Sequence, residues 1–133
     1  GIHMTKLEEA RLFFAKDRFA TENGAVIDEI GENYAICSME ITPHHQNAAG
    51  RVMGGAVFML ADFAFAVASN FGHTPDVTTT SQITFLRASQ GKRLFARSQE
   101  VRRGKTAVYY ETSVTDDTGA LIARVTASGQ ILA

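Results

Sequence analysis

The segment Ala56–Ala68 reads AVFMLADFAFAVA, in which Asp62 is the one residue that is not apolar. Gly54 and Gly55 precede the segment, and it contains no proline. This pattern predicts an α-helix that is apolar on every side, which a globular protein has to bury. The segment is shorter than the roughly 20 apolar residues that cross a membrane. The rest of the chain, or a second copy of it, must therefore cover this helix.

Asp62 is the exception within this helix. An ionised carboxylate is costly to transfer into an apolar interior unless it is paired or used. We expect Asp62 to be buried, and a buried acid without an obvious partner is a candidate functional group. The alternative is a structural acid that is paired with a cation.

The composition indicates a single globular domain with no strong electric field. The chain has 133 residues, 45% of them hydrophobic and 20% charged, and a net charge of −1. These values favour neither nucleic acid nor a membrane as a partner. Its single cysteine, Cys37, fits a reducing compartment, so we expect a cytoplasmic protein without a visible signal peptide. Residues 1–3 resemble the remnant of a cleaved tag, which leaves 4–133 as the domain.

Hydrophobic periodicity predicts the other elements. Residues 6–20 favour one moderately amphipathic helix. Alternation of apolar and polar residues, bounded by turn residues, predicts strands over 25–30, 34–41, 77–87, 94–102, 106–116 and from Leu121 onward. The last three strands are joined by short turns and should form an antiparallel meander. We therefore predict an α+β fold, in which a curved antiparallel sheet wraps around the long central helix.

A motif lies around the start of the apolar helix. It consists of Asn47, Gly50, Met53, Gly54 and Gly55, followed by Leu60-Ala61-Asp62. This motif and the order of elements resemble the hotdog-fold acyl-CoA thioesterases of the PaaI (phenylacetyl-CoA thioesterase-like) branch. The family usually has histidine where this chain has Met53, and methionine cannot form the same hydrogen bonds. The resemblance implies a hotdog fold. It also implies that Asn47 takes part in catalysis, either by hydrogen-bonding the attacking water or by orienting Asp62. The alternative is that Asn47 only shapes a loop turn.

Thioester hydrolysis requires a polarised carbonyl group and an activated water or a carboxylate nucleophile. Free N–H groups and the positive end of the dipole lie at a helix N-terminus. Gly54 lets a substrate approach this backbone, and the Gly55 N–H is the natural oxyanion donor. Asp62 is then the nucleophile or the general base. Coenzyme A would be part of the substrate, and no separate cofactor is expected.

The spacing of these two groups predicts a dimer. Gly55 and Asp62 are seven residues apart, so they lie on nearly the same helix face but roughly 10 Å apart along the axis. Reacting atoms need to approach within about 3–3.5 Å. Two antiparallel copies of the helix would place Gly55 of one chain opposite Asp62 of the other. We predict a homodimer with shared sites, and the resemblance implies a tetramer built from two such dimers.

Further candidate residues flank this centre. His45 is expected to line the substrate pocket, whereas His44 and His45 alone rarely form a metal site. Thr78 is expected to help position water, although threonine also simply favours strands. Arg103 and Lys105 are candidates for binding the phosphates of coenzyme A, the alternative being a solvated hairpin. Candidates for the acyl pocket are Phe58, Phe63, Phe65 and Phe85.

Two functions from different classes remain. The first is an acyl-CoA or aryl-CoA thioesterase that uses Asp62 and the Gly55 N–H. The second is an acyl-CoA-binding or sensory module without turnover, which the replacement of the usual histidine by Met53 keeps open. A panel of CoA esters, assayed for free thiol, would distinguish them.

Overall fold

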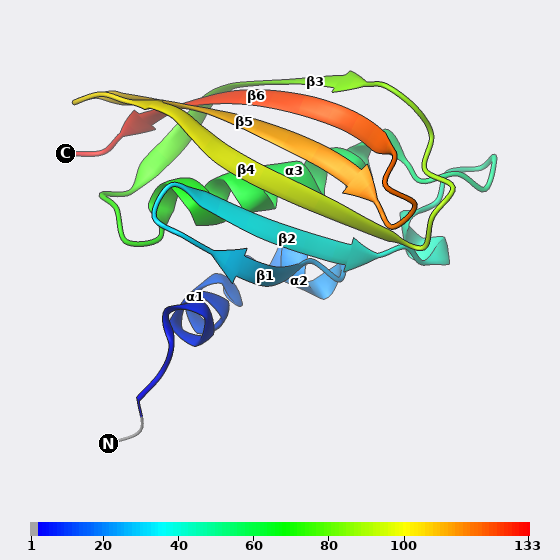
Figure 1. Cartoon of the computed structure of the whole chain (residues 1–133), viewed down its shortest axis with the longest axis horizontal. Helices are drawn as coiled ribbons and strands as arrows, with labels where there is room; N and C mark the ends of the chain where they lie inside the picture. Colours follow the sequence, from blue (N-terminus) through cyan, green and yellow to red (C-terminus); the bar gives the residue numbers. More distant parts are fainter. Residues whose placement is uncertain (1–2) are drawn as a thin grey trace.

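The computed structural model describes residues 3–133, and the predicted tag remnant lies outside this range except for His3. A curved antiparallel sheet wraps around one long helix, α3, with two short helices outside (Figure 1). The helices are α1 (Lys6–Phe14), α2 (Arg18–Glu22) and α3 (Gly54–Asn70). The strands are β1 (Val26–Ile30), β2 (Tyr34–Glu40), β3 (Asp76–Phe85), β4 (Arg93–Arg103), β5 (Ala107–Asp116) and β6 (Leu121–Ile131). The predicted α+β architecture is confirmed.

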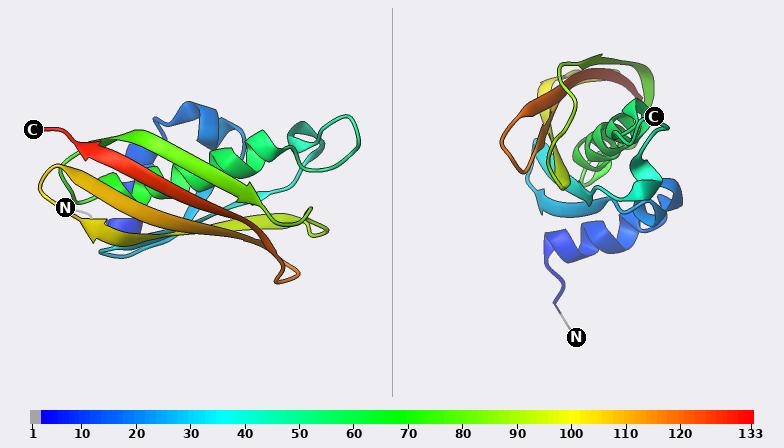
Figure 2. Two further views of the ribbon diagram at one scale, coloured as in Figure 1. Left: turned by 90° about the horizontal axis from the view of Figure 1, so that it is seen from above. Right: turned by 90° about the vertical axis from the view of Figure 1, so that its right-hand side faces the viewer.

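The sheet has six strands in the order β1-β2-β4-β5-β6-β3. The meander predicted for the last three strands is confirmed, because β4 pairs with β5 and β5 with β6, both antiparallel. β3 precedes β4 in the chain but pairs with β6, so it forms an edge of the sheet. The end-on view in Figure 2 shows the sheet curling around α3, so that one side of this helix faces away from the sheet.

Alternation of side chains along the strands builds the core under the concave face of the sheet. On β5 the buried residues are Val108, Tyr110, Thr112, Val114 and Asp116. The Tyr110 ring meets Phe65 of α3 edge-on, with ring centroids 5.3 Å apart. Cys37 on β2 is fully buried, and burial, followed by the charge of Asp28, raises its pKa to about 12. Cys37 is therefore an unreactive core residue.

The N-terminal region differs from the prediction of a single helix over 6–20. α1 ends at Phe14, and a separate short helix, α2, begins after Asp17, which occupies its N-cap position. Apolar side chains in this region do not form one continuous buried stripe, because Phe14 is buried whereas Phe19 is 75% exposed. Breaking the helix allows α2 to turn and lie beside α3.

A short loop leads into α3. Pro43–His45 forms one turn of 3-10 helix, and an isolated bridge then joins Gln46 to Val52. Between them Gly50 has a φ of 75°, a left-handed conformation that glycine adopts without strain. This loop fixes where the chain enters α3 and thus where the first helical N–H groups point.

Candidate active site

The N-terminal end of α3 has free hydrogen-bond donors. The N-cap residue Met53 is extended and its side chain makes no capping hydrogen bond. Among residues 3–133 the N–H groups of Gly54 and Gly55 donate to no acceptor, whereas the Ala56 N–H donates to the Met53 carbonyl at 2.9 Å. Two unpaired N–H groups at the positive end of a helix dipole are suited to bind an oxyanion.

The two glycines of this helix end have different surroundings. A Cβ added to Gly54 would lie 2.8 Å from Cζ of Phe85, so β3 packs directly on this residue. A Cβ added to Gly55 would meet only the Met53 sulfur, at 4.0 Å. Gly54 is therefore required by packing within the chain, whereas Gly55 is left accessible to a substrate or to another chain.

Asp62 is not buried in the single chain, contrary to the expectation from sequence. It is exposed on the side of α3 that faces away from the sheet, together with Gly55. Met59 and Ala66 lie on the same side and are half-buried. The sheet covers α3 from one side and α2 only flanks the other, so a stripe formed by Gly55, Met59, Asp62 and Ala66 remains uncovered.

The environment of Asp62 still perturbs its titration. Partial burial against apolar neighbours raises the pKa of Asp62, and the negative charge of Asp17 raises it further. Within the described part of the chain, the Asp62 carboxylate takes part in no hydrogen bond or ion pair. An unpaired acid with a raised pKa, exposed on an otherwise apolar stripe, is suited to act as a base or a nucleophile.

The loop residue Asn47 is exposed, and its side chain shapes the loop. Its Oδ1 accepts hydrogen bonds from the N–H groups of Ala49 at 3.0 Å and Arg51 at 3.1 Å. This is the loop-turn role that was the alternative to catalysis. A role of Asn47 in positioning water stays a prediction, and it would fall to the side-chain NH₂.

His45 is buried, and its ring is held within the chain. The Thr42 N–H donates to Nδ1 at 3.0 Å, so Nε2 carries the proton and donates to the Asn23 carbonyl at 2.6 Å. The bond at Nδ1 therefore holds the ring within the entry loop, and the bond at Nε2 ties this loop to Asn23 at the end of α2. The expected place of His45 in the substrate pocket stays a prediction, and a polar contact with substrate would have to replace one of these bonds.

Thr78 lies on the exposed part of β3, next to a bulge in its pairing with β6. The neighbouring Thr79 hydroxyl donates to the Ser128 carbonyl at 3.2 Å, whereas no hydrogen bond is found for the Thr78 side chain within residues 3–133. The structure thus leaves the Thr78 hydroxyl available at the sheet edge, and its positioning role stays a prediction.

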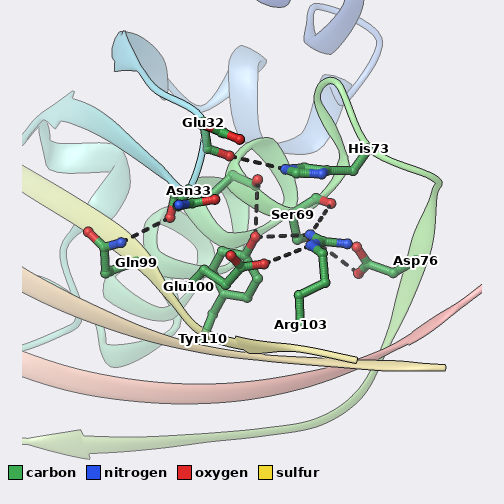
Figure 3. A network of polar contacts seen from close by, with 10 residues as sticks. Glu32, Asn33, Ser69, His73, Asp76, Gln99, Glu100, Arg103 and Tyr110 are labelled. Atoms are coloured by element: carbon green, nitrogen blue, oxygen red, sulfur yellow. Dashed lines mark hydrogen bonds and ion pairs between the residues drawn. The ribbon is translucent and has the colours of Figure 1, made fainter. Parts of the chain in front are cut away.

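Arg103 is engaged at the other end of α3, away from Gly55 (Figure 3). Its Nε is 2.7 Å from Glu100 Oε1, with which it forms an ion pair. Its Nη2 donates to the Ser69 carbonyl at 3.2 Å and to the Tyr110 hydroxyl at 3.1 Å. Nε and Nη2 of this guanidinium are thus used within the chain, and the expected phosphate-binding role of Arg103 stays a prediction. Lys105 is exposed in the following turn and forms no ion pair within the described range.

One neighbour of Asp62 was missed from the sequence. Asp17, at the start of α2, lines a cavity of about 280 Å³ together with Asp62 and Phe63. Asp17 stands in a charged run, Lys16-Asp17-Arg18, that looks like an ordinary solvated surface. No local pattern could indicate its position, because it depends on how α2 packs beside α3.

Neither a metal cluster nor a membrane span is found in the described chain. Residues 3–133 contain no group of three His, Cys, Asp or Glu side chains placed to hold a metal ion. None of the helices described is both long and apolar enough to cross a membrane.

Comparison with known proteins gives consistent matches. Residues 49–123 match the family model described as the thioesterase superfamily. The acyl-coenzyme A thioesterase PaaI of Escherichia coli is 30% identical over 110 residues, covering 82% of this chain and 79% of PaaI. A curated protein of Archaeoglobus fulgidus is 37% identical over 100 residues, which span 74% of this chain and just under two thirds, 65%, of that protein.

Solved structures show the same fold. A mutant of the phenylacetic acid degradation protein PaaI from Thermus thermophilus aligns with a TM-score of 0.82 at 28% identity, covering 87% of this chain and 100% of its own. The E. coli PaaI structure aligns with a TM-score of 0.83 at 25% identity, covering 96% of each chain. The hotdog architecture expected from the sequence motif is confirmed.

Proposed function

The chain belongs to the thioesterase superfamily, as a PaaI-type hotdog protein, and on this premise we propose that it hydrolyses acyl-CoA or aryl-CoA thioesters to the free acid and coenzyme A. The observation that carries the proposal is the uncovered stripe of α3. This stripe presents the Asp62 carboxylate and the Gly55 N–H, neither of which has a hydrogen-bond partner within residues 3–133. Support also comes from a Streptococcus pneumoniae protein of the same fold that was solved with coenzyme A.

The proposed reaction uses these two groups on one carbonyl. The Gly55 N–H stabilises the negative charge that develops on the thioester oxygen. Asp62 either removes a proton from water as the water oxygen attacks the carbonyl carbon, or attacks this carbon itself to give an anhydride that water then hydrolyses. In both routes the C–S bond breaks, coenzyme A leaves as the thiolate and is protonated, and the acid is released.

A homodimer would complete the site. Within one chain the two groups lie two helical turns apart, roughly 10 Å along the axis. The uncovered stripe and the exposed edge strand β3 both leave apolar surface for a second copy, including Val77, which is 48% exposed, and Phe85, which is 54% exposed. A two-fold axis beside α3 would place Gly55 of one chain against Asp62 of its partner and create two equivalent sites.

The test of the activity is a panel of acyl-CoA and aryl-CoA esters, assayed for free thiol. We expect the wild-type protein to hydrolyse at least one ester and Asp62→Asn to reduce kcat/KM by about 10²–10⁴-fold. The melting temperature and oligomeric state of the variant serve as controls. Wild-type rates no higher than those of Asp62→Asn across the panel would refute the hydrolase function.

The shared site has a separate test. As homodimers, Asp62→Asn and Gly55→Pro should each keep about 1% of wild-type activity or less. In a heterodimer of the two variants, one of the two sites has both wild-type groups, so we expect about half of the wild-type activity. Confirmed heterodimers that regain no activity would contradict a site formed between subunits.

The alternative function, acyl-CoA binding without turnover, is favoured by one observation. The Met53 side chain is 56% exposed and lies next to Gly55, at the position where the family usually has histidine. If the wild-type protein hydrolyses no ester, the next experiment is to assay the Met53→His variant for thiol release with the same esters. A gain of thiol release in this variant would identify the wild-type chain as a binding module built on a catalytic fold.

A further inference from the structure

A groove runs between α2 and α3 beside the Asp62 carboxylate. Its volume is about 280 Å³, just below the roughly 300–1,000 Å³ of pockets that bind drug-sized ligands. Its walls are mostly apolar. The residues that line it are Asp17, Arg18, Phe19, Ala20, Met59, Asp62, Phe63 and Ala66. A group bound in this groove would lie within reach of Asp62, which fits the acyl part of a thioester better than the large coenzyme A part.

Negatively charged side chains outnumber positively charged ones around this groove. Its titratable residues are Asp17, Arg18 and Asp62. Arg18 is largely exposed and forms an ion pair with Glu22, at 2.7 Å. Asp17 occupies the N-cap position of α2, yet its side chain makes no capping hydrogen bond. Both carboxylates are therefore without a cationic partner within residues 3–133, and the groove is locally negative.

The titration of both acids agrees with this description. Burial raises the pKa of Asp17. For Asp62, burial is the larger cause and the charge of Asp17 adds to it. The two carboxylates therefore repel each other across the groove, although both lie on the exposed surface of the single chain.

We propose that Asp17 is a specificity-determining residue, which excludes acyl groups that end in a carboxylate from the groove next to Asp62. This inference rests on the proposed function, because it assigns the groove to the acyl part of the CoA ester. A neutral acyl or aryl group gains contact with the apolar walls. An acyl group with a terminal carboxylate would meet the unpaired charge of Asp17, a repulsive element of the kind that produces selectivity.

The test compares two esters of equal chain length, butyryl-CoA and succinyl-CoA, whose acyl groups end in a methyl group and a carboxylate. Their Kd values are measured by calorimetry in the Asp62→Asn background, with and without Asp17→Asn. Because the Asp17 side chain makes no capping hydrogen bond, and asparagine is accepted at N-cap positions, α2 should be retained. We expect Asp17→Asn to lower the ratio of Kd for succinyl-CoA to Kd for butyryl-CoA about tenfold. The control Glu9→Gln removes the same charge from an exposed site on α1 and should leave the ratio unchanged.

A ratio that stays within about twofold of its value without Asp17→Asn would overturn the proposal. Failure of butyryl-CoA to bind, or failure of succinyl-CoA to bind after Asp17→Asn, would overturn it as well. If Asp17→Asn instead changes the oligomeric state while the ratio is constant, the groove receives the second copy of the chain and the proposal is wrong. Absence of thiol release by protein with an intact Asp62 would refute the hydrolase function alone, because the Kd ratio would still decide the role of Asp17.

A pH profile gives a second measurement in the active protein. Replacing Asp17 by Asn removes the negative charge that raises the pKa of Asp62. Asp62 should then stay ionised to lower pH, and the acid limb of kcat/KM for butyryl-CoA should shift to lower pH. An unshifted acid limb would contradict electrostatic coupling between the two carboxylates.

Discussion

The two ends of α3 differ in whether their backbone groups have hydrogen-bond partners. At the N-terminal end, Gly54 and Gly55 carry N–H groups with no acceptor in the described chain, and Met53 provides no side-chain cap. At the C-terminal end, Arg103 and Tyr110 donate hydrogen bonds to the last helical carbonyls, those of Ser69 and Ala68, at 3.2 and 3.4 Å. The N-terminal end, which we call the open end, is thus accessible to a ligand. The C-terminal end, which we call the closed end, is hydrogen-bonded by the protein itself.

The closed end also fixes the chain that follows it. Asn70 donates to the Ala66 carbonyl at 3.0 Å and accepts a hydrogen bond from the Asp76 N–H at 2.8 Å. The Ser69 hydroxyl donates to Asp76 Oδ1 at 3.3 Å, so the start of β3 is attached to the end of α3. Because buried polar groups are normally paired, this network has a structural explanation. The unpaired donors at the other end have none within the chain, which is why the open end is the candidate site.

Gly55 provides the sharpest test of the open end. Gly55→Pro removes the N–H, and proline is tolerated in the first turn of a helix. We expect kcat/KM to fall about 10²–10³-fold, the usual cost of losing one oxyanion donor. Gly55→Ala keeps the N–H and has space for its Cβ, so its loss should be below about tenfold. Equal losses in both variants would show that Gly55 serves packing against a second chain rather than oxyanion binding.

A substitution of Arg103 tests whether the closed end contributes to stability rather than to substrate binding. Arg103→Met should lower the free energy of unfolding by about 1–3 kcal/mol, because it leaves the Ser69 carbonyl, Tyr110 and Glu100 without this partner. Denaturant unfolding measures this loss. The KM for a CoA ester should change less than about twofold in the folded fraction. For the unfolding measurement, Lys105→Ala is the matched control, because it removes a positive charge from an exposed side chain. A large rise in KM without loss of stability would return Arg103 to a phosphate-binding role.

The smallest effect is expected at Asp76. Its Oδ2 is buried without a partner, and burial raises the pKa of this carboxyl despite hydrogen bonding from Ser69. At neutral pH the folded state therefore carries a cost that the unfolded state does not, and Asp76→Asn removes it. We expect the melting temperature to rise by about 1–3 °C at pH 7, with the difference vanishing below the ordinary carboxyl pKa of about 4. A lower melting temperature at pH 7 would show that Asp76 is needed as an anion.

Much of the fold was predictable because its signals are local. The alternation over 106–116 marked β5, and the apolar run over Ala56–Ala68 marked α3. The division of 6–20 into α1 and α2 was not predicted, since the exposure of Phe19 has no signature in the periodicity. The sequence motif likewise brought Gly55 and Asp62 to attention, but it could not show that His45 and Arg103 already have partners within the chain.

The sequence by itself determined the long apolar helix, its glycine-opened start and the acid two turns along, because helix period and residue chemistry depend on neighbours in the chain. The tertiary structure decided which side of that helix stays uncovered, and so turned Asp62 from an expected buried acid into an exposed group on an apolar stripe. It also brought Asp17 beside Asp62 from 45 residues away. Such contacts follow from how the sheet and α2 pack around α3, which no local pattern encodes.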